Sequence, residues 1–274
     1  IMRDPNKVCF IISHKYFRGY TSYIKYYADN IKKLYPDSLT IIVDNNSVYK
    51  DDVLKELEGL EGVIILDNDI DSKFEIGAYT VGLNYLITNH LHDQYSHIVC
   101  SQDNFVLKNR YDFETMVKDN CYARPINSMF ADGECRNIVI PVMNMLGLND
   151  NWDKVNFCWC SSFAINSEKA SQLFEYFNKI RVTCRWESCA GERYLARILW
   201  ELNEHKDCGD IDGSCSDLAV RHYDTWNVNV FAPSTSFFVK QVQQKNERTV
   251  DSDAPQHITF KHRDQLEQDY NKTK

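Results

Sequence analysis

The sequence contains no glycine-rich phosphate signature and no long apolar run. Neither G-x-G-x-x-G nor G-x-x-x-x-G-K-[ST] occurs anywhere in the 274 residues. These absences argue against Rossmann dehydrogenases, methyltransferases and P-loop NTPases, because such proteins bind phosphate groups or cofactors on these loops. No stretch of about 18 consecutive apolar residues is present, so a membrane-spanning helix is not expected.

Excess positive charge and a secretion signal are also missing. Lys and Arg together number 31, against 39 Asp and Glu, which gives a formal net charge of −8. Such a chain lacks the general attraction to phosphate backbones, so nucleic acid is not an expected partner. The N-terminal segment has no small-residue cleavage site, and we therefore expect a cytoplasmic location. Without repeats or low-complexity blocks, a single domain is the simplest organisation.

Cysteine, by contrast, is abundant, with ten residues. Four of them lie within apolar runs, namely Cys9, Cys100, Cys158 and Cys160. A free thiol in such a run behaves as a small hydrophobe. Disulfides or a zinc site are the alternatives for four later residues, Cys184, Cys189, Cys208 and Cys215. Their spacing does not match paired C-x2-C knuckles, and with no secretion signal we expect reduced thiols.

Strand and helix patterns alternate in the first half of the chain, which predicts an α/β fold with a mostly parallel central sheet flanked by helices. The predicted strands are Val8–Ser13, Leu39–Val43, Gly62–Leu66 and His97–Cys100. The predicted helices cover about 23–34, 50–60 and 76–91. Three of the strands run into acidic or amide residues, and ligands bind at the carboxyl ends of strands in open α/β sheets. A polar ligand crevice is therefore expected there.

The second half has a less regular pattern. It predicts a buried strand at Phe157–Ile165 and helices at Glu168–Ile180 and about Ala190–Leu202. The residues after 240 are polar and predict a loosely attached extension. The expected organisation is a single domain over 1–240, with a nucleotide-binding half (7–110) and an acceptor-binding half (111–240), followed by a C-terminal extension (241–274).

Three segments resemble motifs of GT-A glycosyltransferases of the family-two type. They are IIVDNNS at 41–47, KFEIGAY at 73–79 with GLN at 82–84, and HIVCSQDNFVL at 97–107. The compact chain is also similar to glycosyltransferases encoded by large DNA viruses of algae. The resemblance implies a GT-A fold and the transfer of a monosaccharide, with inversion, from a UDP-sugar to a hydroxyl of a glycan or glycoprotein acceptor.

The segment 97–107 is similar to the D-x-D strand of that family, with one departure. Ser101 stands at the first acidic position and Asp103 at the last. The resemblance implies that Asp103 binds Mn²⁺ or Mg²⁺, which neutralises the charge that builds on a departing diphosphate. It further implies that His222 is a late metal ligand. The missing first Asp leaves weak metal binding, or metal independence, open. A simple turn aspartate is the alternative for Asp103.

By the same resemblance, donor-binding residues lie at the strand ends and the loops that follow them. They are Ser13, His14, Asp44, Asn46, Asp67, Lys73, Ser101, Gln102 and Asp103. Asp44 is expected to accept a hydrogen bond from the base or the ribose, and its alternative is an Asx-turn with the following residues. A solvated acidic turn is the alternative for Asp67, and surface positions are the alternatives for His14 and Lys73.

The catalytic base is expected from the second half of the chain. A carboxylate must take the proton of the attacking hydroxyl. The segment WESCAGERYL at 186–195 resembles the acceptor-side segment of the family, where an acidic residue opens a helix. Glu192 is the first candidate and Glu187 the second, although acidic residues also stabilise first helical turns without catalysis. Trp186 is expected to stack on an acceptor sugar, with core packing as its alternative.

Two other functions remain open from the sequence. One is a nucleotidyltransferase that makes nucleotide-sugars, although the segment after the first strand has a single Gly, at position 19. The other is a non-catalytic carbohydrate-binding relative, which the serine at position 101 suggests.

Overall fold

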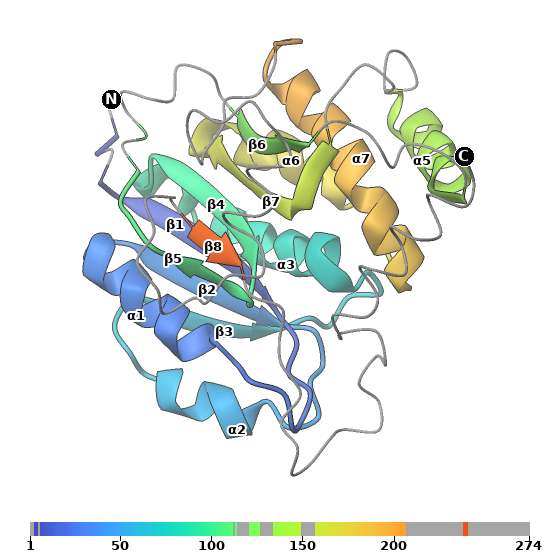
Figure 1. Cartoon of the computed structure of the whole chain (residues 1–274). Coiled ribbons are helices and arrows are strands. Elements are labelled where there is room, and N and C mark those ends of the chain that lie inside the picture. Colours follow the sequence, from blue (N-terminus) through green and yellow to red (C-terminus); the bar gives the residue numbers. More distant parts are fainter. Residues whose placement is uncertain are drawn as a thin grey trace.

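A six-stranded sheet with helices on both faces forms the centre of the molecule (Figure 1). The computed structural model describes residues 3–4, 6–111, 113, 121–126, 134–148, 157–206 and 238–240. The strand order is β3-β2-β1-β4-β7-β6. These strands are β1 (Val8–His14), β2 (Leu39–Asp44), β3 (Val63–Asp67), β4 (His97–Gln102), β6 (Cys121–Ile126) and β7 (Phe157–Asn166). A separate two-stranded sheet pairs β5 (Phe105–Leu107) with β8 (Phe238–Lys240).

The sheet is parallel from β3 through β4, whereas β7 runs antiparallel to β4 and β6 antiparallel to β7. Parallel neighbours need crossover connections, which helices supply here. The α-helices are α1 (Ile24–Leu34), α2 (Asp51–Leu54), α3 (Phe74–Thr88), α5 (Glu134–Leu146), α6 (Ala170–Phe177) and α7 (Arg185–Leu202). Short 3₁₀ turns cover Lys55–Leu57, His92–Gln94 and Ser167–Lys169. The expected α/β fold with a mostly parallel sheet is therefore confirmed.

Each buried strand contributes to two hydrophobic cores, because successive side chains of a strand point to opposite faces. On one face, Ile11 and Cys100 pack with α3, α5, α6 and α7. On the other face, Phe10 and Val99 pack with α1, α2 and the β5–β8 pair. Coverage of both faces explains why the strands read as continuous apolar runs and do not alternate with polar residues.

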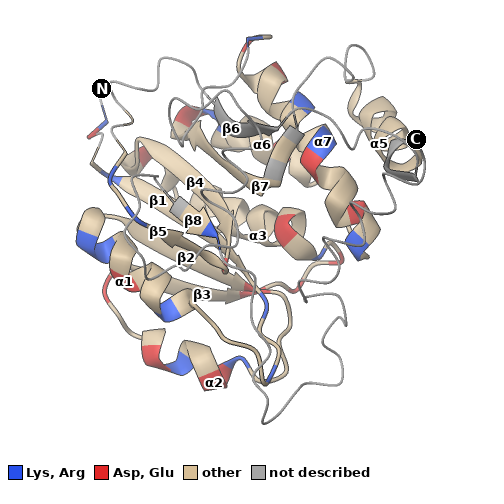
Figure 2. Cartoon of the chain, viewed as in Figure 1, with Lys and Arg blue, Asp and Glu red and all other residues tan. Residues whose placement is uncertain are grey.

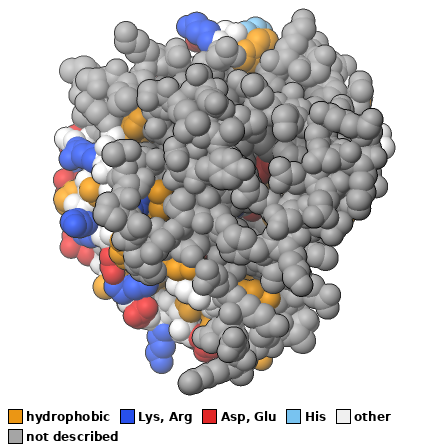
Figure 3. Space-filling model, viewed as in Figure 1, with side chains coloured by type: hydrophobic (Ala, Val, Ile, Leu, Met, Phe, Trp, Pro, Cys, Tyr) orange, Lys and Arg blue, Asp and Glu red, His pale blue; other side chains and the backbone are white. Residues whose placement is uncertain are grey.

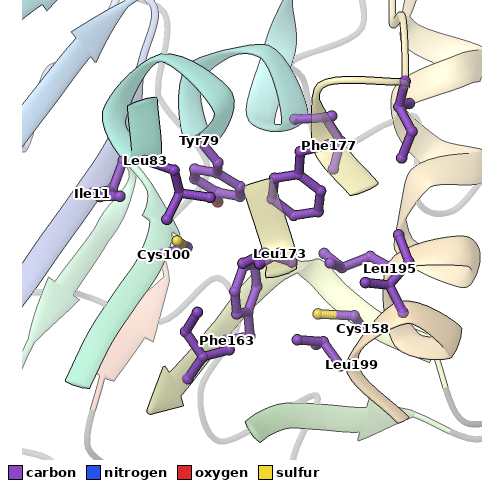
Figure 4. Close-up of a cluster of buried hydrophobic side chains, with 14 of the residues drawn as sticks. Ile11, Tyr79, Leu83, Cys100, Cys158, Phe163, Leu173, Phe177, Leu195 and Leu199 are labelled. Carbon is purple, nitrogen blue, oxygen red and sulfur yellow. The ribbon is translucent and has the colours of Figure 1, made fainter. Parts of the chain in front are cut away.

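Aromatic rings pack among the aliphatic side chains of the first of these cores (Figure 4). Phe163 of β7 meets Tyr79 of α3 edge-on, with ring centroids 5.8 Å apart. The same Phe163 meets Phe177 of α6 at 6.3 Å, again edge-on. This arrangement is the favoured geometry for aromatic pairs. The contacts join the antiparallel part of the sheet to α3, which belongs to the parallel half.

Several element boundaries differ from those that the sequence predicts. The expected helix at 50–60 is only α2 followed by a 3₁₀ turn, and Gly59 then takes a φ of 75° that ends it. The helix α7 begins at Arg185, five residues before the expected Ala190. Its earlier start is explained by its cap, because the Glu187 carboxylate accepts hydrogen bonds from the backbone N–H groups of Thr183 and Cys184.

The cysteine side chains that the structure describes are free thiols. Cys9, Cys100, Cys158 and Cys160 are buried, as the apolar runs around them predict. Cys184 is exposed and Cys189 is intermediate. Cys208 and Cys215, the other members of the later group, lie outside the described residues.

The helices and the outer surface carry mixed charge. Along the edge where α1 and α2 lie, positively and negatively charged side chains are interspersed (Figure 3), and those of the two helices are Lys and Asp. Lys25 and Asp29 of α1, for example, pair at 2.7 Å one helical turn apart. Across the described residues, no helix combines the length and the apolar character needed to cross a membrane.

Candidate functional site

The carboxyl ends of β1, β2 and β4 meet at one edge of the sheet, as the sequence predicts. These strands are adjacent and parallel, with His14 opposite Asp44 and Ser13 opposite Gln102. The turn after β4 brings Asp103 back to this edge, because its backbone N–H donates to the Ser13 carbonyl at 3.0 Å. Residues from three separated segments therefore form one polar group.

His14 lies between two carboxylates in this group. Its Nδ1 donates to Asp44 Oδ1 at 2.8 Å, and its Nε2 lies 4.0 Å from Asp103 Oδ2. All three side chains are buried. The Nε2 atom has no hydrogen-bond partner within the described part of the chain. The bond to Asp44 fixes the ring so that Nε2 faces the Asp103 carboxylate.

Asp44 is a fully satisfied buried carboxylate. Besides His14, it accepts hydrogen bonds from the Ser47 backbone N–H at 2.7 Å and from the Ser47 hydroxyl at 2.6 Å. Burial acts to raise the pKa of Asp44, but the bonds from His14 and Ser47 outweigh it, and the net pKa is lowered. The Asx-turn and the role of fixing His14 thus coexist at this residue.

The pKa of Asp103, unlike that of Asp44, is raised on balance. Its Oδ2 accepts the Lys15 backbone N–H at 2.8 Å. Burial raises the pKa of Asp103, and neither the His14 charge nor this hydrogen bond fully offsets it. Glu75, at the start of α3, raises the pKa further by repulsion. Asp103 therefore lies where an added positive charge is stabilising.

The loops after β2 and β3 are tied together beside this group. The Asn68 amide donates to Asn45 Oδ1 at 2.8 Å and to the Ser72 carbonyl at 3.0 Å. The Lys73 ammonium donates to the carbonyls of Asn68 and Ile70. Asn46, oriented to satisfy its neighbours, donates to the Asn68 carbonyl and accepts from Lys73. In this structure Lys73 and Asn46 hold the loops in place.

Ser13 and Ser101 occupy different faces of the sheet edge. The Ser13 hydroxyl accepts from the Asn45 amide at 3.0 Å, within the polar group. Ser101 is fully buried on the α1 face, where its hydroxyl bonds the Tyr27 hydroxyl at 2.7 Å. The strand alternation explains this separation, because Gln102 then points to the opposite side. The structure does not bring the Ser101 side chain to the other candidates.

The second half of the chain contributes Glu192. One carboxylate oxygen accepts the Cys160 backbone N–H of β7 at 2.6 Å. Because α7 begins at Arg185, Glu192 lies two turns inside the helix and not in its first turn. The expectation that Glu192 opens the helix is therefore wrong. Stabilisation by the helix dipole therefore does not explain an acidic residue at this position, because the dipole acts within the first turn.

A series of contacts connects Glu192, through Cys160 and Lys240, to Gln102 at the end of β4 and on to Glu75 of α3. Glu75 accepts from the Gln102 amide at 2.6 Å and from the Ser188 hydroxyl of α7 at 2.7 Å. Gln102 in turn accepts from the Lys240 ammonium of β8 at 2.6 Å, and Lys240 also contacts Cys160 Sγ at 3.0 Å. Figure 2 shows acidic residues at the carboxyl end of β3 and near the start of α3. The two halves of the chain thus meet through side chains.

The pKa of Glu192 is raised to about 7. Burial is the main cause, and repulsion from Glu75 adds to it. The Lys240 ammonium and the hydrogen bond from Cys160 act in the opposite direction. A carboxyl group with a pKa near neutrality is suited to exchange a proton with a substrate.

The backbone is strained around this site. Cys160 and Ser161, in the middle of β7, have φ values of 52° and 50°. Asn46, in the loop after β2, and Phe74, the first residue of α3, have φ values of 58° and 59°. Non-glycine residues rarely adopt this region, and such residues gather at functional sites. The bulge at Cys160 aims its N–H at Glu192.

Besides Ser101, three other predicted site residues lie apart from this group. Glu187 caps α7, where its carboxylate also accepts from the Thr183 hydroxyl at 2.9 Å. Trp186, one position earlier, is 58% exposed. Asp67 is opposite Asp44 in the sheet register, yet its carboxylate is exposed and pairs with Lys50. His222 lies outside the described residues.

Of the two metal ligands that the resemblance implies, Asp103 and His222, the structure describes only Asp103. Among the described residues, no group of three or more His, Cys, Asp and Glu side chains is able to hold a metal ion. One carboxylate suffices for Mg²⁺ only when substrate phosphates and water complete the shell. The ammonium of Lys240 lies within electrostatic range of Asp103 and already supplies positive charge to this carboxylate.

Sequence reasoning missed three residues of this site. Glu75 lies inside the KFEIGAY segment, so that motif contained a signal for it. Cys160 belongs to a run that reads as an ordinary buried strand, and its turned backbone has no local signature. Lys240 stands at the boundary of the polar C-terminal region, where nothing in the sequence indicates its pairing with β5.

Two comparisons with known proteins give no match. No protein-family model and no curated protein matches the chain. The function is therefore inferred from the residues of the site and their geometry.

Proposed function

We propose that this protein is a GT-A glycosyltransferase that moves a monosaccharide from a UDP-sugar to an acceptor hydroxyl. The observation that carries the proposal is the link between its two halves. Strand-end polar residues, of the kind that contact a nucleotide, connect through Gln102 and Lys240 to Glu192. The carboxyl of Glu192 has a pKa of about 7, which suits a general base.

The donor nucleotide is assigned to the edge formed by β1, β2 and β4. His14 Nε2 and the Asp103 carboxylate are the polar groups directed at this edge. Asp44 holds the His14 ring, so its contribution is to orient the atom that meets the donor. Binding at the carboxyl ends of parallel strands is the general rule for open α/β sheets, which supports the assignment.

The reaction is a single displacement at the anomeric carbon. The oxygen of the acceptor hydroxyl forms a new bond to that carbon. The bond from the carbon to the diphosphate oxygen breaks, and its electron pair stays on the diphosphate. The hydroxyl proton passes to the ionised carboxylate of Glu192. Because one displacement inverts the carbon, the product has the opposite anomeric configuration.

A donor screen tests this proposal. Purified full chain is incubated with UDP-glucose, UDP-galactose, UDP-xylose or UDP-rhamnose and a mixture of glycan acceptors, with Mn²⁺ and with EDTA. We expect release of UDP and a glycosylated product. Glu192→Gln should lower the rate about 100-fold or more, because the base is lost. The exposed Glu175→Gln on α6 is the matched control and should keep the rate.

Other products would point elsewhere. Pyrophosphate released from a nucleoside triphosphate and a sugar phosphate would support a nucleotidyltransferase. An unchanged rate in Glu192→Gln would remove the base assignment. If no UDP-sugar is turned over and glycans still bind, a carbohydrate-binding protein becomes the better description.

A further inference from the structure

Lys240 reaches the centre of the site from a distant part of the chain. It belongs to β8, which pairs antiparallel with β5, and its register partner is Phe105. Phe105 lies two residues after Asp103, directly behind the turn that contains it, so the pairing sets Lys240 beside that turn. The side chain is buried, with 7% exposure. A buried ammonium needs compensating contacts, since its transfer from water costs several kcal/mol by general estimates.

Two of its hydrogen-bonding contacts are with uncharged groups. The ammonium donates to Gln102 Oε1 at 2.6 Å and contacts Cys160 Sγ at 3.0 Å. Burial raises the pKa of the Cys160 thiol to about 12, so this sulfur is a neutral thiol and a weak acceptor. The ammonium also lies 5.4 Å from the centroid of the Phe105 ring. An anionic oxygen would be a far better partner than the thiol.

The ammonium is surrounded by acidic residues from three elements. Burial raises the pKa of Asp103, in the turn after β4, and Lys240 is one of the charges that oppose the rise. The same holds for Glu192 of α7, where Lys240 is the strongest opposing charge. Glu75 of α3 repels both carboxylates and is joined to Lys240 through Gln102. Lys240 thus supplies positive charge where the acidic groups converge.

This arrangement differs from a metal site. Among the described residues, no group of three or more His, Cys, Asp and Glu side chains is placed to hold a divalent cation, and the Lys240 ammonium already lies near Asp103. We propose that Lys240, and not a divalent cation, supplies the positive charge that binds the diphosphate of the donor. The inference rests on the proposed function, because it assigns a ligand group within the same site. It makes Lys240 a binding residue for the leaving group.

The chemistry of transfer is compatible with a lysine in this role. When the bond to the anomeric carbon breaks, the diphosphate gains the electron pair and one unit of negative charge. An ammonium hydrogen-bonded to a phosphate oxygen stabilises that charge without giving up its proton. In this role, an anionic phosphate oxygen would take the place of the neutral Cys160 thiol beside the buried ammonium. The acceptor proton still goes to Glu192, so the step remains balanced.

Calorimetric titration of the full chain with UDP and with uridine tests the inference. In EDTA we expect wild-type protein to bind UDP. Lys240→Met should weaken UDP binding in EDTA about tenfold to 100-fold, the range expected for a lost charge-assisted hydrogen bond. Uridine, which has no phosphate, should bind both proteins equally. Lys240→Arg should retain most of the affinity for UDP. Lys25→Met, in an exposed pair on α1, is the matched control for removal of a lysine charge.

The outcomes separate this inference from the proposed function. UDP binding that requires Mn²⁺, or equal UDP affinity in folded Lys240→Met and wild type, would overturn the role of Lys240 alone. No UDP binding in either EDTA or Mn²⁺ would overturn both proposals. Thermal unfolding of each variant shows whether it is folded. If Lys240→Met does not fold, Lys240→Gln replaces it, and the wild-type titration in EDTA still decides on the metal.

Discussion

The Nδ1 atom of His14 lies 2.8 Å from Oδ1 of Asp44, and both side chains are buried. Asp44→Asn removes the charge that this imidazole faces and one of the acceptor oxygens used by Ser47. We expect a loss of about 2–4 kcal/mol of unfolding free energy, because buried polar partners are left unpaired. Urea denaturation at pH 7 measures the loss.

Asp67 provides a matched control for this prediction. It stands opposite Asp44 in the register of β2 and β3, but its carboxylate is exposed. Asp67→Asn should change stability by less than about 1 kcal/mol, since exposed ion pairs contribute little. The pKa of Asp44 is lowered, so its ionised form stabilises the fold above the ordinary pKa and this contribution is lost as the pH falls. A deficit of Asp44→Asn that persists undiminished in acid would contradict the assignment.

The contribution of Glu192 to the free energy of unfolding has the opposite dependence on pH. Its pKa is raised from 4.5 to about 7 in the folded protein. The folded state then binds more protons than the unfolded state between these values, so stability falls as the pH rises through that window. Relative to Glu192→Gln, the wild type should lose on the order of 2–3 kcal/mol between pH 4.5 and pH 8. Parallel urea titrations at several pH values give this difference.

The raised pKa of Glu192 also predicts how the rate of sugar transfer depends on pH. Glu192 acts as a base only when ionised, so the rate should rise with pH and reach half its plateau near pH 7. Lys240 lowers the pKa of Glu192, and Lys240→Met should move this midpoint to higher pH. Initial rates of UDP release in both proteins measure the shift. A midpoint that stays near the ordinary glutamate pKa would exclude Glu192 as the titrating base.

The sequence predicts the parallel half of this fold well because local signals there agree. Strands β1 to β4 are apolar runs that end in polar turns, and both their faces are covered, so pattern and burial coincide. The short strands β5 and β8 were not predicted. Each has three residues, and their pairing joins distant segments, so no local pattern encodes it. The helix α5 was also missed, and Pro141 inside it disguises its periodicity.

The candidate site likewise contains residues that local sequence patterns predict and residues that depend on distant partners. Asp44 and Asp103 are predicted because an apolar run followed by polar residues indicates the end of a strand. The hydrogen bonds that make His14 and Glu192 chemically distinctive come from partners 30 and 32 residues away. Lys240 lies 138 residues from Gln102, to which it donates. Such partners depend on tertiary packing, and a pattern-based prediction does not reach them.

Glu187 and Glu192 lie five positions apart on α7 and are predicted to differ in function. Glu187 accepts hydrogen bonds from Thr183 and Cys184, and these bonds lower its pKa. Glu187→Ala should cost about 1 kcal/mol of stability, the usual effect of a lost helix cap. The midpoint of the pH–rate profile should not move. A profile that loses its acidic limb in Glu187→Ala would instead make Glu187 the base.

The close approach of α3 to β1 depends on Gly82. A Cβ atom built on this residue would lie 2.5 Å from Cγ2 of Ile11, which is buried in the centre of the sheet. Gly82→Ala should therefore destabilise the fold by about 1–3 kcal/mol through overpacking, even though alanine is the better helix former. Asn84→Ala, at an exposed position of the same helix, should be nearly neutral or slightly stabilising. Because α3 also carries Glu75, displacement of the helix would disturb the Glu75–Gln102 hydrogen bond and weaken UDP binding in parallel. Urea denaturation and UDP titration of both variants test this coupling. A Gly82→Ala protein as stable as wild type would show that α3 and β1 separate without a cost in free energy.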